Sequence, residues 1–133
     1  MKIREIYDSA LRLTCEIDHP TANDDYEERA TYLVSLICHR YASLDRDYRS
    51  LKGLGAQEIL QINCFPMPAL FPLSDVFAPA VSAALAGMLV MDENAEMSQR
   101  LSDLSGQMID EIKSEMQVKP QYQLESIASR YVF

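Results

Sequence analysis

The sequence contains no tryptophan, only two histidines and four glycines, and its three cysteines lie far apart. Cys15, Cys38 and Cys64 lack CxxC spacing and are odd in number, which argues against a zinc knuckle and a disulfide framework. We expect all three to be small core residues. His19 and His39 belong to no HExxH, GxSxG or zinc-deaminase pattern, and no glycine-rich phosphate loop is present. A hydrolase motif is therefore missing.

Positive charge and long apolar runs are also scarce. Twelve Lys and Arg face twenty Asp and Glu, a net charge of −8, whereas nonspecific nucleic-acid binding depends on clustered basic residues. The longest apolar run, residues 83–91, is far short of the ~20 residues that span a bilayer, and the N-terminus has no signal-peptide apolar core. We expect an intracellular, soluble protein with a solvated acidic surface and no membrane partner.

The composition that remains fits one helical domain. The 133 residues are 48% apolar and 24% charged, typical of a globular chain with one core. We predict an all-α fold of about four helices around a helical hairpin, with a short extended or β arm and an extended tail. The single domain covers residues 1–133: a helical core over 1–117 that includes an extended insertion over 56–73, and a C-terminal tail over 118–133.

Apolar residues three or four apart predict the four helices. The first covers about residues 2–15. The second begins in an acidic capping cluster near Asp24 and continues to Gly53, on the order of 40 Å, longer than one core of this size needs. We expect it to project or to pack against a neighbour.

The third and fourth predicted helices form an antiparallel hairpin, because only residues 92–94 connect them. Ser74 and Asp75 are the expected caps of the third helix, with Pro79 in its first turn. Small residues on one side of the third helix allow another helix to approach closely. We expect the third helix to be the most buried of the four. The fourth carries an apolar stripe from Met97 to Met116.

The insertion between the second and third helices changes to a period of two. Residues 57–65 read as a short strand or extended arm, and the alternating C-terminal residues 126–133 are its best local partner, within the chain or between chains. Prolines 66, 68 and 72 then hold the chain extended, so its apolar side chains need cover from the domain's own core or from another subunit.

The insertion and the tail supply the candidate contacts with a partner or a second copy of the chain. These are Phe65, Met67, Leu70, Phe71, Ile127, Tyr131 and Phe133.

Three interpretations of the sequence as a catalytic, nucleic-acid-binding or metal site are less favoured than a purely structural explanation of the same residues. Cys38 and His39 are adjacent, and helical geometry turns them about 100° apart, which prevents a nucleophile–base pair. Tyrosines and arginines alternate along the second helix, but its acidic residues neutralise it and favour a salt-bridged face over base stacking. Nucleotide hydrolases that hold Mg²⁺ use paired carboxylates that point inward at mid-helix. The acidic residues here cluster at two helix starts, where capping and the helix dipole explain them: Asp24, Asp25, Glu27, Glu28, Asp92, Glu93 and Glu96.

The order of these segments resembles prophage-encoded head–tail connectors, the small helical adaptors that form a ring beneath the portal. The similar stretches are MKIREIYDSALRL, DYEERATYLVSLICHRYASLDRDYR, FPLSDVFAPAVSAALAGMLVMDEN and SQRLSDLSGQMIDEIKSEM. They cover most of residues 1–117. The glycine-containing turn that often follows the first helix in that family is replaced here by residues 13–16.

The resemblance implies a structural protein of the virion, present in the bacterial host cytoplasm during assembly, with no catalytic, metal or cofactor site. Identical subunits would form a ring that extends the portal channel. The implied partners are copies of itself and the portal, tail or stopper proteins, and DNA would pass through the channel without specific binding. Two alternatives stay open: a small all-α metal-dependent nucleotide hydrolase, and a helical interaction module without a virion role.

Overall fold

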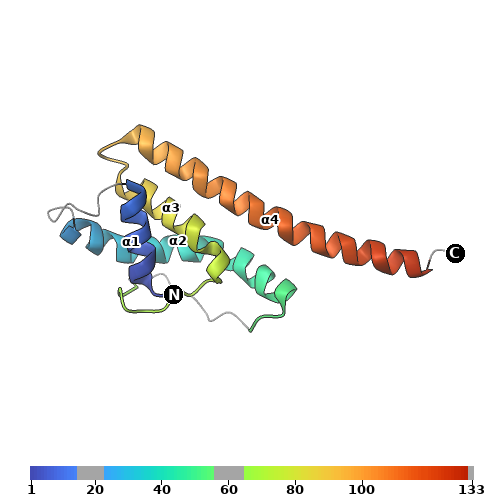
Figure 1. The fold of residues 1–133 in the computed structure, drawn as a ribbon. Coiled ribbons are helices and arrows are strands. Elements are labelled where there is room, and N and C mark those ends of the chain that lie inside the picture. The colour runs from blue at the N-terminus through green and yellow to red at the C-terminus, as the bar shows by residue number, and fades with distance from the viewer. Residues whose placement is uncertain (15–22, 56–64, 132–133) are drawn as a thin grey trace.

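The computed structural model describes the backbone of residues 1–14, 23–55 and 65–131, and the side chains of 1–14, 26–55 and 65–117. The helices are α1 (Ile3–Thr14), α2 (Asn23–Lys52), α3 (Ala78–Leu89) and α4 (Ala95–Tyr131), with a 3₁₀ turn, η1 (Asp75–Phe77), before α3 (Figure 1). The described residues contain no strand and one isolated β-bridge, between Lys2 and Leu70. The all-α prediction is confirmed, whereas the predicted strand, except for Phe65, lies outside the described residues.

A glycine cap ends the long helix α2 where the sequence predicted. Gly53 has a φ of 67°, a left-handed conformation that residues with a Cβ rarely adopt. The N–H of Leu54 donates to the carbonyl of Arg49 at 2.9 Å, and the N–H of Gly53 donates to that of Ser50 at 3.4 Å. These two bonds form a Schellman motif, which satisfies carbonyls that the helix end would leave open.

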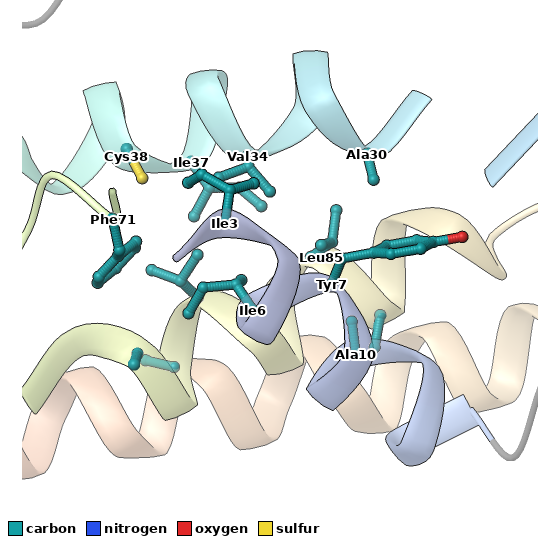
Figure 2. Packing of buried hydrophobic residues seen from close by; sticks show 14 of the residues in the cluster. Ile3, Ile6, Tyr7, Ala10, Ala30, Val34, Ile37, Cys38, Phe71 and Leu85 are labelled. Carbon is teal, nitrogen blue, oxygen red and sulfur yellow. The ribbon is translucent and has the colours of Figure 1, made fainter. Parts of the chain in front are cut away.

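Helix α3 lies at the centre of the fold, and α1, α2 and α4 all pack against it. Nine of its twelve residues are buried, as expected for a helix that is apolar on every side. Figure 2 shows how α1 completes the core: Ile3 of α1 lies beside Val34 and Ile37 of α2, and Tyr7 of α1 lies beside Leu85 of α3. The prediction that the third helix is the buried one is confirmed.

The α3–α4 hairpin is held in register by two serines. Ser98 Oγ donates to the carbonyl of Gly87 at 2.8 Å, and Ser105 Oγ donates to the carbonyl of Ala80 at 2.7 Å. The two serines are seven residues apart on α4, and their two acceptors are seven residues apart on α3. The same faces of the two antiparallel helices therefore stay in contact over about two turns. This confirms the predicted hairpin and the close approach at its small residues.

Helix α4 continues beyond the core. Met116 is the last described α4 side chain that packs against the core cluster, and the C-terminal part of α4 runs away from the other helices (Figure 1). We call residues 118–131 of α4 the overhang. The extended tail expected here is wrong for these residues, because the helix continues through Pro120 to Tyr131. Lengthening an existing helix avoids the cost of nucleating one, and much of this sequence favours helix.

Candidate functional site

The proline loop, residues 65–74, is bound to the N-terminus of its own chain. The N–H of Ile3 donates to the carbonyl of Ala69 at 2.9 Å, and the N–H of Arg4 donates to that of Met67 at 3.0 Å. The first N–H groups of a helix have no partner within the helix, so the loop supplies the missing acceptors at the start of α1. The N–H of Phe71 returns a bond to the carbonyl of Met1 at 2.8 Å.

Three apolar side chains of the loop are buried in the core of the domain. Met67 is 7% exposed, Phe71 8% and Leu73 2%, and the N–H of Phe65 donates to the carbonyl of Thr31 on α2 at 3.0 Å. Of the predicted contact residues in the loop, Met67 and Phe71 therefore face inward and Phe65 is partly buried. Leu70 is 72% exposed and is the large apolar side chain of the loop that is open to a partner.

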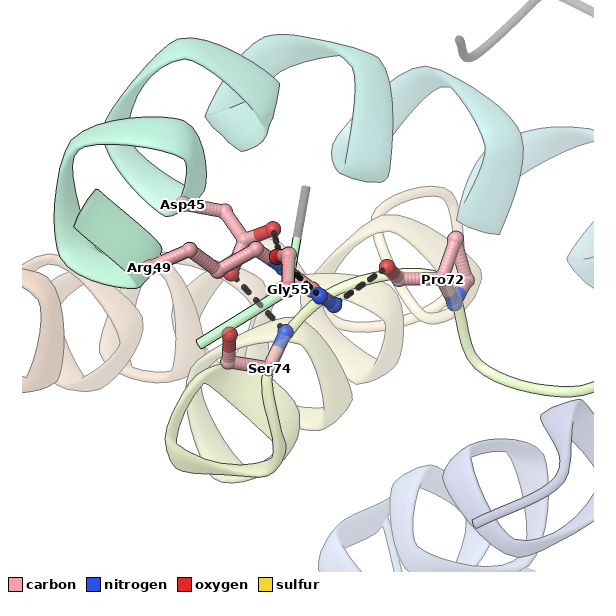
Figure 3. A network of polar contacts seen from close by, with 5 residues as sticks. All are labelled: Asp45, Arg49, Gly55, Pro72 and Ser74. Carbon is pink, nitrogen blue, oxygen red and sulfur yellow. Dashed lines mark hydrogen bonds and ion pairs between the residues drawn. The ribbon is translucent and has the colours of Figure 1, made fainter. Parts of the chain in front are cut away.

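A buried ion pair joins the loop to α2 (Figure 3). Asp45 is fully buried, and its Oδ2 lies 2.9 Å from Nε of Arg49. Arg49 also donates to the carbonyl of Gly55 and to the carbonyl of Pro72, both at 3.3 Å, which holds the two ends of the insertion together. The other carboxylate oxygen of Asp45 accepts the N–H of Ser74 at 2.9 Å.

Ser74 does not cap the third helix in the way its sequence position predicted. It occupies the position before η1 but forms no side-chain cap bond. Its hydroxyl is buried and has no hydrogen-bond partner among the described residues. The contact between its N–H and Asp45 instead fixes the backbone at the start of η1.

Cys38 and His39 do not form a nucleophile–base pair. Cys38 is fully buried and His39 is exposed. Burial, with a smaller contribution from the charge of Asp45, raises the pKa of the Cys38 thiol to about 12. The thiol is therefore protonated near neutral pH and unsuited to attack a substrate.

Two of the acidic residues at the helix starts form ion pairs. Glu27 pairs with Arg4 at 2.7 Å, and Glu96 pairs with Arg100 at 2.5 Å. Among the described residues, no three His, Cys, Asp or Glu side chains gather closely enough to hold a metal ion. Asp24 and Asp25 lie on α2, but their side chains are outside the described set.

The structure does not bring the two groups of predicted contact residues together. The proline loop lies beside the N-terminus, whereas Ile127 and Tyr131 lie on the overhang at the other end of the molecule (Figure 1). Phe133 is outside the described residues. No described helix has the length and apolar character needed to cross a bilayer.

The sequence analysis missed an apolar groove between α1 and α4 that is floored by the start of α3. The groove has a volume of about 470 Å³. Its apolar lining consists of Met1, Ile6, Leu13, Ala78, Pro79 and Met108. Leu13 follows the helical spacing of a core residue yet remains 40% exposed, and Met1 is 49% exposed. The signal in the sequence was an apolar face of α1 wider than two neighbouring helices can cover.

No family model matches this chain, and no curated protein or solved structure matches it either.

Proposed function

We propose that this chain is a structural protein of phage or prophage virion assembly, a head–tail connector whose copies form a ring under the portal. The observation that carries the proposal is the overhang. The described core is closed by Met116, yet α4 continues to Tyr131. A helix that outlasts its own core favours a role in contacts between chains.

The sequence resemblance supports the same function. Its four stretches coincide with α1, α2, α3 and α4, and the FAPAVSAALAG stretch forms most of the central helix. Their order resembles the connector organisation over most of residues 1–117. Two features therefore support the proposal: the order of the helices, and the part of α4 that extends beyond the core.

The charge of the chain suits the proposed channel. With a net charge of −8, a ring of these subunits would repel DNA phosphates, so DNA could pass without adhering. The partners are copies of the chain, the portal protein, and tail or stopper proteins. The assembled protein belongs to the virion, and its subunits are in the bacterial host cytoplasm until assembly.

Co-expression with the portal protein encoded in the same genome tests this function. We expect an affinity tag on the portal to capture the chain in a fixed ratio and electron microscopy to show added density below the portal ring. A portal from an unrelated phage is the control. Failure of the cognate portal to capture the chain, or magnesium-dependent turnover of nucleotides by the purified chain, would contradict the proposal.

A further inference from the structure

We infer that the overhang of one subunit occupies the α1–α4 groove of the next subunit, and that this contact is the joint of the ring. The inference rests on the self-assembly part of the proposed function and not on binding to the portal. It gives the same chain both a donor segment and an acceptor site.

The acceptor site is apolar and partly open. The groove separates α1 from α4 over the first turn of α3, where Pro79 is exposed. Leu13 and Met1 on its α1 side keep 40% and 49% of their surface accessible. Covering such side chains gains about 25 cal/mol per Å² of apolar surface, so a helix with an apolar face is the natural occupant.

The donor segment has a matching pattern. In a helix at 100° per residue, positions 124, 127, 128 and 131 fall on one side, and these positions are Leu, Ile, Ala and Tyr. Because α4 carries this segment away from the core (Figure 1), the groove of the same subunit is not in its path. In the proposed joint, the segment enters the groove of a neighbouring copy instead.

Charge complementarity gives the contact a direction. Arg12 and Asp75 lie on the groove lining, and neither forms an ion pair with another described residue. Helical geometry puts Glu125 on one flank of the donor face and Arg130 on the other. The groove lining and the donor helix thus each carry one acidic and one basic residue, and the proposed joint pairs Glu125 with Arg12 and Arg130 with Asp75.

A contact between two different surfaces of the same chain is heterologous, and such contacts make rings when the rotation between subunits closes. The overhang and the groove are two different surfaces of this kind. Each subunit would give one overhang and accept one, which leaves no free joint in a closed ring.

Complementation between two defective variants tests the joint. Leu13→Asp spoils the groove but leaves the overhang, and Ile127→Asp spoils the overhang but leaves the groove. We expect each alone to remain at the monomer mass of 15.1 kDa at concentrations where the parent assembles. When the two variants are mixed, the intact overhang of Leu13→Asp can occupy the intact groove of Ile127→Asp. The mixture should therefore give a heterodimer of about twice the monomer mass.

Two controls separate the joint from misfolding and from general acidity. Leu54→Asp changes a half-exposed leucine outside the groove and should assemble like the parent. Circular dichroism should show parental helix content in all three variants. Arg12→Glu and Glu125→Arg should each weaken assembly at least tenfold, and the double variant should recover most of it.

A parent that is monomeric at all concentrations, a mixture that gives no heterodimer, or a double charge variant no better than its single variants would overturn the inference. Portal capture of the same variants keeps the two proposals apart. Monomeric variants that retain parental assembly on the portal would refute the joint and leave the connector function standing. A parent that assembles through this joint but ignores the portal would refute the connector alone.

Discussion

The carbonyl of Gly87 accepts a 2.8 Å hydrogen bond from the hydroxyl of Ser98 across the α3–α4 hairpin. A Cβ at position 87 would lie 3.1 Å from the carbonyl oxygen of Ser98 and 3.4 Å from Cβ of Leu101. The two helices can therefore approach this closely only because residue 87 has no side chain, and this contact sets the distance between α3 and α4.

Gly87→Ala should destabilise the protein although alanine is the better helix former. The added methyl group forces the helices apart and strains the Ser98 bond, and we expect the free energy of unfolding to fall by about 1–3 kcal/mol. Gly106→Ala is the matched control, since a Cβ there meets nothing within 4 Å, and it should stabilise by up to about 1 kcal/mol. Urea unfolding measures both. Equal effects of the two changes would contradict the close-approach account.

Arg49→Met should weaken the fold by removing the partner of a buried carboxylate. Asp45 is fully buried whereas the Arg49 side chain keeps 23% exposure, so we expect a loss of about 3 kcal/mol, the lower end for breaking a buried pair. Arg100→Met breaks an exposed pair whose side chains are both 76% accessible and should cost at most about 1 kcal/mol. Chemical denaturation would compare them, and a neutral Arg49→Met would show that the pair does not hold the insertion.

Cys38 should make stability fall as the pH rises above about 9. Its pKa is about 12 in the folded chain against a reference value of 9.0, so between these values the unfolded chain releases a proton that the folded chain keeps. The contribution of Cys38 is complete below pH 9 and declines by at most about 1.4 kcal/mol per pH unit above it.

Comparison with Cys38→Ala isolates that effect, because the other titrating groups are common to both proteins. At pH 8 the variant should have a smaller free energy of unfolding than the parent, because it has lost a core contact. This difference in unfolding free energy between the two proteins should be smaller at pH 10. Urea titrations at the two pH values give the difference. A difference of constant size would mean that the thiol of the folded chain ionises like a solvated one.

Deletion of residues 121–133 should leave the core intact and weaken self-association. The described core cluster ends at Ile112, with Met116 packed against it, so the melting temperature should change little. Helix content should fall only by the share of residues removed. A loss of helix larger than that, or a parental oligomer mass, would count against an overhang that acts between chains.

Local patterns in the sequence were sufficient to predict α1, α2, α3 and the part of α4 that packs on the core. Spacing of three or four residues gave α1 and α2, and Gly53 gave the end of α2 because a left-handed φ is nearly specific to glycine. The hairpin followed from a connection too short for any other arrangement. These features depend on neighbours in the sequence, which a pattern can show.

The continuation of α4 through Pro120 was missed, because proline usually ends a helix. The other missed features depend on distant neighbours. The proline loop had to be covered by something, but only the fold shows that Met67 and Phe71 belong to its own core while Leu70 does not. Asp45 looked like one more charge on a neutralised helix, because Pro72 and Ser74 approach it only in three dimensions. The groove arises from the relative placement of three helices, which no single stretch encodes.

The most direct test of the connector function is the absolute molar mass of the chain by light scattering, alone over a range of concentrations and then with its cognate portal. We predict a large closed oligomer whose mass is a multiple of the 15.1 kDa subunit, or a large complex once the portal is added. A small stable oligomer whose mass does not respond to the portal would contradict the account.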